Sequence, residues 1–123
     1  MAKRKAKEES PKGMLECIID AMEDKKAERI VIMDLSEIES RIADQFIVCS
    51  GSSGIQVEAI AENVERKLKE TAGLRPFHRE GYENAEWILL DYFDVIVHVF
   101  NETARDFYEI EKLWADAVIN YHD

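Results

Sequence analysis

Acidic side chains and a histidine stand among strand-forming residues in EWILLDYFDVIVHVF, residues 86–100. Asp91, Asp94 and His98 are residue types that bind metal ions or transfer protons. On one strand, Asp94 and His98 would point to the same face but lie about 13 Å apart, at ~3.3 Å per residue. Because the ligands of one ion must converge, we predict no metal site. His98 is expected instead to be a hydrogen-bonded histidine of the core.

A second candidate for chemistry is CSGSSG, residues 49–54, which lies between a predicted strand and a predicted helix. Backbone N–H groups in such a turn can hold phosphate, and nucleotidyltransferases use a similar Gly-Ser turn. Those enzymes also need two carboxylates that alternate on one strand to hold Mg²⁺. Here the run is Asp94-Val95-Ile96, so the second carboxylate is missing. We therefore predict a helix-capping turn, no catalytic residues and no cofactor, and keep a Mg²⁺-dependent nucleotidyltransferase-like enzyme as the alternative.

The two cysteines, Cys17 and Cys49, each lie in an apolar segment and form no CxxC pair. They are expected to be small, reduced core residues rather than a disulfide or a catalytic thiol.

Aromatic and acidic residues alternate through the same segment, and they suggest a surface for another protein. Trp87, Asp91, Tyr92 and Asp94 form the candidate contact, since fixed aromatic rings anchor interfaces and carboxylates select a basic partner. In the alternative interpretation these are ordinary core aromatics beside solvated charges. Alternation along a strand would place Trp87 and Asp91 on one face and Tyr92 on the other.

The residues before this segment predict a helix, two strands and a second helix. Residues 1–12 contain five basic residues and are expected to be a disordered tail. Apolar spacing predicts a helix over 14–26, and β-branched runs predict strands over 29–35 and 45–51. Ser53 and Gln56 have the spacing of a capping box, and Gly73 suits the end of the helix that follows.

The remaining elements complete a single predicted domain over residues 13–118. A short strand is expected around Phe77, followed by an antiparallel hairpin of residues 87–92 and 95–100. Thr103 is expected to cap a third helix, and the tail at 119–123 is expected to fray. The apolar stripe predicted for that helix comprises Phe107, Ile110, Leu113, Trp114 and Ala117. The fold class is α/β or α+β, a mixed sheet of about five strands packed by three helices.

Charge favours a basic protein as the partner. The 123-residue chain has 26 acidic and 16 basic residues, a net charge of −10. Residues 13–123 hold 24 of the acidic and 11 of the basic residues, a balance of −13, which repels phosphate backbones and speeds encounter with cations. No apolar run approaches the roughly 20 residues that span a bilayer, so we expect a cytoplasmic protein without a membrane partner. The basic tail is a candidate contact for RNA.

From about residue 14 to residue 117 the sequence resembles the ribosomal silencing factor family, also called the Iojap family. The matching motifs are VIMDLSEI, DQFIVCSGSSGIQVEAIAENVE, HREGYENAEWILLDYFDVIVHVF and ARDFYEIEKLWADA. Among the matching positions are the Glu80-Gly81 pair, Trp87 and Asp91. The basic tail and VINYHD are expected to lie outside the pattern.

The resemblance implies a fold like that of the nucleotidyltransferases without their catalysis. It implies a factor that binds the large ribosomal subunit through its fourteenth L-series protein and sterically prevents the small subunit from joining, which represses translation. A role in large-subunit biogenesis and homodimers of some members are also associated with the family. On this view the tail would contact ribosomal RNA, and Trp87 and Tyr92 would anchor the protein contact.

Overall fold

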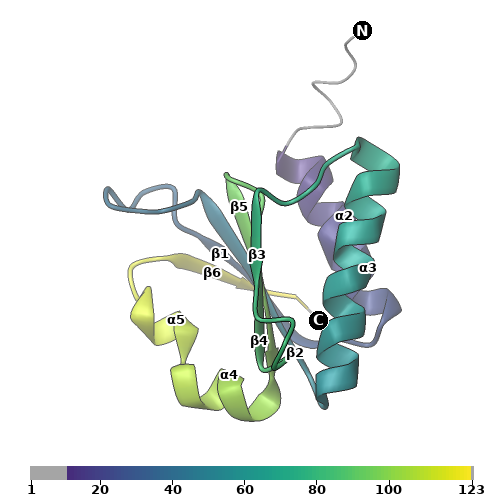
Figure 1. Ribbon diagram of the computed structural model, residues 1–123. Helices are drawn as coiled ribbons and strands as arrows, with labels where there is room; N and C mark the ends of the chain where they lie inside the picture. The colour runs from purple at the N-terminus through teal and green to yellow at the C-terminus, as the bar shows by residue number, and fades with distance from the viewer. Residues whose placement is uncertain (1–10, 123) are drawn as a thin grey trace, which may run out of the picture.

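The computed structural model describes residues 11–122, and it arranges them as a six-stranded mixed sheet with helices on both faces (Figure 1). The strand order is β3-β4-β5-β2-β1-β6. In chain order the elements are α2 (Pro11–Asp24), β1 (Glu28–Asp34), β2 (Gln45–Gly51), α3 (Gly54–Ala72), β3 (His78–Glu80), β4 (Trp87–Asp91), β5 (Val95–Asn101), α4 (Glu102–Tyr108), α5 (Ile110–Leu113) and β6 (Val118–Tyr121).

The centre of the sheet is the parallel pair β2 and β5, and the other neighbouring strands pair antiparallel. Both central strands are buried along nearly their whole length. A strand covered on both faces must be apolar on both, which explains the continuous runs FIVC and VIVHVF. The predicted antiparallel hairpin is confirmed as β4 and β5, with Trp87 opposite Phe100 and Asp91 opposite Ile96.

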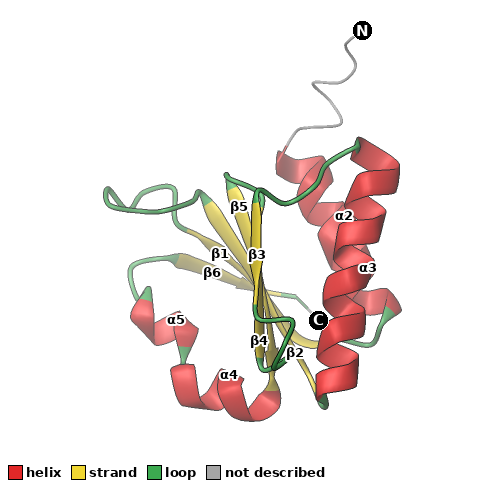
Figure 2. Cartoon of the chain, viewed as in Figure 1, coloured by secondary structure: helices red, strands yellow, loops and turns green. Residues whose placement is uncertain are grey.

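Helices α2 and α3 lie together on one face of the sheet (Figure 2). The stripe of α3 that was predicted from spacing is buried: Val57, Ile60, Val64 and Leu68. Ser53 caps α3 by accepting a hydrogen bond from the backbone N–H of Gln56, and Gly73 ends the helix with φ 68°. Gln56 departs from the expected capping box, because its Oε1 accepts from the N–H of Ser52 rather than from that of Ser53. Its side-chain amide donates to the carbonyls of Lys25 and Lys26 and so joins the end of α2 to the start of α3.

The opposite face carries α4 and α5, and here the structure corrects the predicted third helix. Glu109 has φ 46° and separates the two short helices. The cap of α4 is Asn101, whose side chain accepts from the N–H of Ala104, so Thr103 already lies inside the helix. Of the predicted apolar stripe Ile110 is buried, Trp114 and Ala117 are half-buried, and Phe107 and Leu113 are exposed.

The sheet has one strand more than expected. Residues 119–123 were expected to fray, but most of them belong to β6 (Val118–Tyr121), which pairs antiparallel with β1, from Val31↔Tyr121 to Asp34↔Val118. The prediction of a disordered tail over 1–12 falls mostly on residues 1–10, which lie outside the described residues, and Pro11 already belongs to α2. Within the described part of the chain, no helix is long and apolar enough to cross a membrane.

Candidate protein interface

Trp87 stands at the start of β4 on the sheet face that α4 and α5 only partly cover. Its indole ring stacks on Phe100, with 4.8 Å between ring centroids, and meets the ring of Tyr108 at 4.8 Å. The indole N–H donates a hydrogen bond to Nδ1 of His98 at 3.0 Å. Trp87 is therefore held in one orientation by three side chains while part of its ring stays accessible, as an interface anchor requires.

His98 lies beneath Trp87 and is a core histidine, as predicted. Phe46 and Phe100 surround its ring, and burial lowers the pKa of His98 to about 3. The ring is therefore neutral at physiological pH, with Nδ1 as the acceptor from Trp87 and the proton on Nε2. Nε2 has no hydrogen-bond partner among the described residues. We expected a hydrogen-bonded histidine, and only Nδ1 forms such a bond.

Apolar side chains on the short helices extend this surface. Phe107 is 78% exposed and Leu113 is 66% exposed, although both were expected in the core. The ring of Phe107 meets that of Tyr108 at 5.0 Å, and Tyr108 meets Trp87, so the rings form a continuous chain from α4 to β4. We call the set the aromatic surface: Trp87, Leu89, Phe107, Tyr108 and Leu113.

The sequence pattern missed Phe107, Tyr108 and Leu113 because it assumed one unbroken helix. A helix that runs from 103 through 113 would turn Phe107 and Leu113 toward the core together with Ile110. The positive φ of Glu109 interrupts that helix, and Ile110 is buried while Phe107 before the break and Leu113 after it are exposed. No glycine or proline marks this break.

The four predicted contact residues do not form one patch. Trp87 and Asp91 share a sheet face, as alternation predicted, but they lie at opposite ends of β4. Tyr92 is 5% exposed and packs in the core on the α2 and α3 side. This position corrects the expectation that Tyr92 anchors a protein contact. Its ring cannot reach a partner from there, and burial raises the pKa of its hydroxyl.

Asp91 and Asp94 both belong to the tip of the hairpin. Oδ1 of Asp91 accepts a hydrogen bond from the N–H of Phe93 at 2.8 Å, which stabilises the turn where Phe93 has φ 77°. Asp91 therefore caps the hairpin turn. The carboxylate of Asp94 is exposed, while its backbone carbonyl accepts from the N–H groups of Asp44 and Gln45.

Carboxylates adjoin the aromatic surface along the chain. Exposed Glu86 precedes Trp87, Asp106 precedes Phe107 and Glu109 follows Tyr108, and exposed Glu102 begins α4. Asp106 forms an ion pair with Arg29 at 2.9 Å, between two side chains that are largely exposed. An apolar centre with an acidic border matches a partner that has an apolar contact ringed by lysine or arginine.

Internal hydrogen bonds already occupy part of the alternative nucleotide site at residues 49–54. The N–H of Ser52 donates to Oε1 of Gln56 at 2.7 Å, and the hydroxyl of Ser53 accepts from the N–H of Gln56 at 3.1 Å. These are groups that a phosphate would need. Within residues 11–122 no cluster of three histidine, cysteine or acidic side chains has the arrangement of a metal site. Cys17 and Cys49 are free thiols, and burial raises the pKa of Cys49 to about 12.

Comparison with known proteins identifies the family. The model of the family described as "Ribosomal silencing factor during starvation" matches residues 7–123. The chain belongs to the ribosomal silencing factor family. The match includes part of the basic tail and the VINYHD segment, which we had expected to lie outside the family pattern.

Individual relatives agree with the family match. The chain is 44% identical over 108 residues to "Ribosomal silencing factor RsfS" of Halalkalibacterium halodurans, covering 88% of this chain and 91% of that protein. A crystal structure of a protein from Chromobacterium violaceum superposes with a TM-score of 0.81 at 40% identity, covering 86% of this chain and 87% of that one. A distant relative is "Mitochondrial assembly of ribosomal large subunit protein 1" of the mouse, which is 24% identical over 102 residues. The match covers 81% of this chain and 44% of the mouse protein.

Proposed function

We propose that this protein binds the large ribosomal subunit through its fourteenth L-series protein and prevents the small subunit from joining, which represses translation. The observation that carries the proposal is the family match over residues 7–123. Such a factor needs only affinity and bulk, because occupying the joining surface is enough to keep the other subunit away.

The aromatic surface supports this mechanism physically. It offers a held indole and exposed apolar side chains within an acidic border, and the protein as a whole carries a net charge of −10. Ribosomal proteins are usually basic, so opposite charge would favour encounter while the rings supply the buried contact. Trp87 is the proposed anchor, Asp91 and Asp94 are proposed to pair with basic groups at the hairpin end, and Tyr92 is left out because it is buried.

A comparison of two exposed side chains tests the surface without disturbing the fold. Phe107 and Tyr121 are exposed to nearly the same extent, 78% and 75%, but Tyr121 lies on β6 at the opposite edge of the sheet from β4. We expect Phe107→Ala to weaken co-sedimentation with large subunits about tenfold and Tyr121→Ala to leave it unchanged. Trp87→Ala should weaken it further, with circular dichroism as the check on folding. Equal binding by all variants would remove the aromatic surface from the contact.

The blocking step needs its own measurement. Purified small and large subunits form joined ribosomes when mixed, and a sucrose gradient separates the three species. We expect added protein to deplete the joined species in proportion to the large subunits it occupies. If the joined peak remains while the protein sediments with it, the protein binds without blocking, and a role in large-subunit biogenesis becomes the better account. The name of the mouse relative favours that second role.

The finer inferences from the family resemblance also remain proposals. They are a nucleotidyltransferase-like fold without catalysis, homodimer formation, a cytoplasmic location and a contact of the basic tail with ribosomal RNA. The enzyme alternative predicts nucleotide binding in the presence of Mg²⁺, which isothermal titration calorimetry measures directly. We expect no heat of binding, since the N–H and the hydroxyl of Ser52 already donate to Oε1 of Gln56.

A further inference from the structure

One part of this acidic protein is strongly basic. Residues 66–79 contain five of the 11 basic residues that follow residue 12, and Glu70 is the only acidic residue among them. The segment covers the second half of α3 and the connection into β3. The remainder of residues 13–123 holds the other six basic residues and 23 acidic residues, so this segment is a local concentration of positive charge on a negative body.

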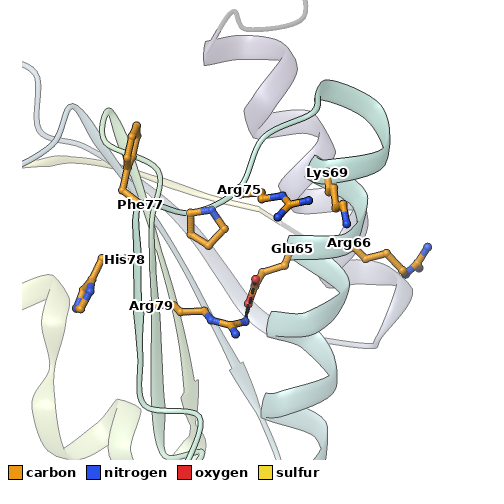
Figure 3. A pocket seen from close by; sticks show the side chains of 8 residues that line it. Glu65, Arg66, Lys69, Arg75, Phe77, His78 and Arg79 are labelled. Atoms are coloured by element: carbon orange, nitrogen blue, oxygen red, sulfur yellow. Dashed lines mark hydrogen bonds and ion pairs between the residues drawn. The ribbon is translucent and has the colours of Figure 1, made fainter.

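This segment lines an open groove of about 730 Å³ between α3 and β3, shown in Figure 3. The residues that line it are Glu65, Arg66, Lys69, Arg75, Pro76, Phe77, His78 and Arg79. Figure 3 shows Lys69 and Arg75 reaching into the space between the helix and the chain that leads to β3, whereas Arg66 points away from it. We call this the basic groove.

The cations of the groove differ in whether a carboxylate already neutralises them. Arg79 donates to both carboxylate oxygens of Glu65, at 3.1 and 3.0 Å, and its guanidinium lies 5.3 Å from the ring centroid of Tyr82. Arg66 pairs with Glu70 at 3.2 Å. Within residues 11–122, Lys69 and Arg75 form no ion pair, and both side chains are exposed. Two unneutralised cations that line one groove repel each other, and an anion between them would remove that repulsion.

We propose that the basic groove binds the phosphate backbone of RNA, with Lys69 and Arg75 as the phosphate contacts. This inference rests on the proposed function, which brings the protein to an RNA-rich particle. The groove is open and lies at the carboxyl end of α3, where no free helix N–H groups are available to enclose a small anion. Binding through exposed side-chain charges is typical of contacts to a polymer backbone. The ring of Phe77 lies edge-on to the ring of Phe93, with 5.9 Å between centroids, and is 77% exposed, so its free face is open to an unpaired base.

The basic groove and the aromatic surface lie on different faces of the sheet. The groove belongs to the α3 side, and α4, the helix that contains Phe107 and Tyr108, lies on the opposite face (Figure 1). One molecule can therefore touch a ribosomal protein and RNA at the same time. The RNA contact adds affinity that depends on salt, and it orients the protein on the subunit.

A double substitution with a matched control tests the proposal in the full chain. Lys69→Gln with Arg75→Gln removes two charges from the groove, and Lys25→Gln with Lys26→Gln removes two exposed charges at the end of α2. The probe is a fluorescein-labelled single-stranded RNA of about 12 nucleotides, a length that one compact domain can cover. Fluorescence anisotropy gives its dissociation constant over a range of salt concentrations.

We expect the groove variant to bind this RNA about tenfold more weakly at low salt, and its slope of log affinity against log salt to be smaller by about 1.4, as two lost phosphate contacts predict. The control variant should keep the slope of the unmodified protein. Equal losses in both variants would mean that net charge alone acts, and no loss in either would mean that the tail binds the RNA; both results overturn the proposal. Preferential binding of a polyglutamate peptide would assign the groove to an acidic protein instead.

Two further binding partners separate this inference from the proposed function. The isolated fourteenth L-series protein contains no RNA, so both double variants should bind it as the unmodified protein does. Intact large subunits should bind the groove variant more weakly and with the smaller salt slope. If the unmodified protein fails to bind large subunits, the proposed function is wrong. The RNA titration would still show whether the basic groove binds RNA.

Discussion

The indole N–H of Trp87 donates to Nδ1 of His98, with 3.0 Å between the two nitrogens. The two residues lie diagonally across the β4 and β5 ladder, since Trp87 is opposite Phe100 and His98 is opposite Leu89. The bond connects a residue at the surface to one that is 3% exposed. The orientation of the proposed anchor thus depends on a neutral histidine in the core.

Replacing the indole tests this bond. Trp87→Phe keeps a ring on Phe100 but leaves Nδ1 of His98 without its donor. We expect the free energy of unfolding to fall by roughly 1–3 kcal/mol, the cost of an unsatisfied buried acceptor together with some lost packing. Urea denaturation measures it. A loss no larger than that of an exposed substitution such as Tyr121→Phe would show that the hydrogen bond contributes little.

The neutral state of His98 also predicts how stability depends on pH. Its pKa is about 3 in the folded protein, because burial disfavours the charged ring, against 6.5 when it is unperturbed. Between these values the unfolded chain binds the proton and the folded protein does not. The contribution of neutral His98 to the free energy of unfolding is therefore fully present above about pH 6.5. As the pH is lowered below that value, this one group reduces the free energy of unfolding by up to about 1.4 kcal/mol per pH unit.

His98→Gln is the variant that isolates this effect, because glutamine does not titrate and its carbonyl can still accept from Trp87. Denaturation between pH 6.5 and 5 should show a smaller slope for the variant than for the unmodified protein. Parallel slopes would mean that His98 does not supply the proton uptake. Acidic groups with lowered pKa values, such as Asp34, add their own loss only at lower pH.

A buried arginine fastens the short helices to the sheet. The side chain of Arg105 is 1% exposed; it donates to the carbonyl of Arg29 at 3.0 Å, to the hydroxyl of Ser50 at 2.8 Å and to Glu111 at 2.7 Å. Burial alone would raise the pKa of Glu111, but the hydrogen bond and the charge of Arg105, together with a backbone hydrogen bond and the charge of Arg29, outweigh burial and lower that pKa. One guanidinium thus joins α4, α5, β1 and β2.

Removing that guanidinium should be costly. We expect Arg105→Met to lower the free energy of unfolding by roughly 3–5 kcal/mol, since it leaves the partly buried Glu111 carboxylate and the Ser50 hydroxyl unpaired. Ser50→Ala removes one partner and should cost about 1 kcal/mol. Urea midpoints of the two variants give the comparison. Similar small losses in both would mean that packing rather than the ion pair holds α4 and α5 in place.

Two glycines with positive φ provide a matched test of backbone geometry near Trp87. A Cβ on Gly81, at φ 94°, would stand 2.0 Å from the carbonyl oxygen of Trp87, whereas a Cβ on Gly73, at φ 68°, would meet nothing within 4 Å. We expect Gly81→Ala to cost about 3 kcal/mol or to displace Trp87, and Gly73→Ala to cost roughly 1 kcal/mol. Thermal melts and tryptophan fluorescence detect the two effects. Equal costs would show that the loop before β4 moves freely.

Sequence patterns predicted those features of the fold that depend on neighbouring residues alone, such as strand faces and helix ends. Alternation placed Trp87 and Tyr92 on opposite faces of the hairpin, and cap signals at Ser53 and Gly73 located both ends of α3. The composition of a single segment could not show that VINY would pair with β1, because an exposed edge strand has little periodicity and its partner lies far away in the chain. The positive φ at Glu109 is likewise not marked by residue type, since neither glycine nor asparagine stands at that position.

The sequence predicted the chemical character of the candidate site but only some of the residues that form it. An aromatic and acidic surface exists, and Trp87 belongs to it. Tyr92 was assigned to it although the same alternation argument placed that ring on the other face. Phe107 and Leu113 were missed, because their exposure follows from the break at Glu109 rather than from residue type.

Strand β1 acquires its two neighbours at very different times during synthesis. β2 begins 11 residues after β1 ends, whereas β6 begins 84 residues after it. As the chain emerges, the outer side of β1 therefore stays without a partner until almost all of the sheet exists. In that interval a second nascent chain can supply its own β6 to the same row of N–H and carbonyl groups, so crowding of polysomes would favour strand exchange between copies.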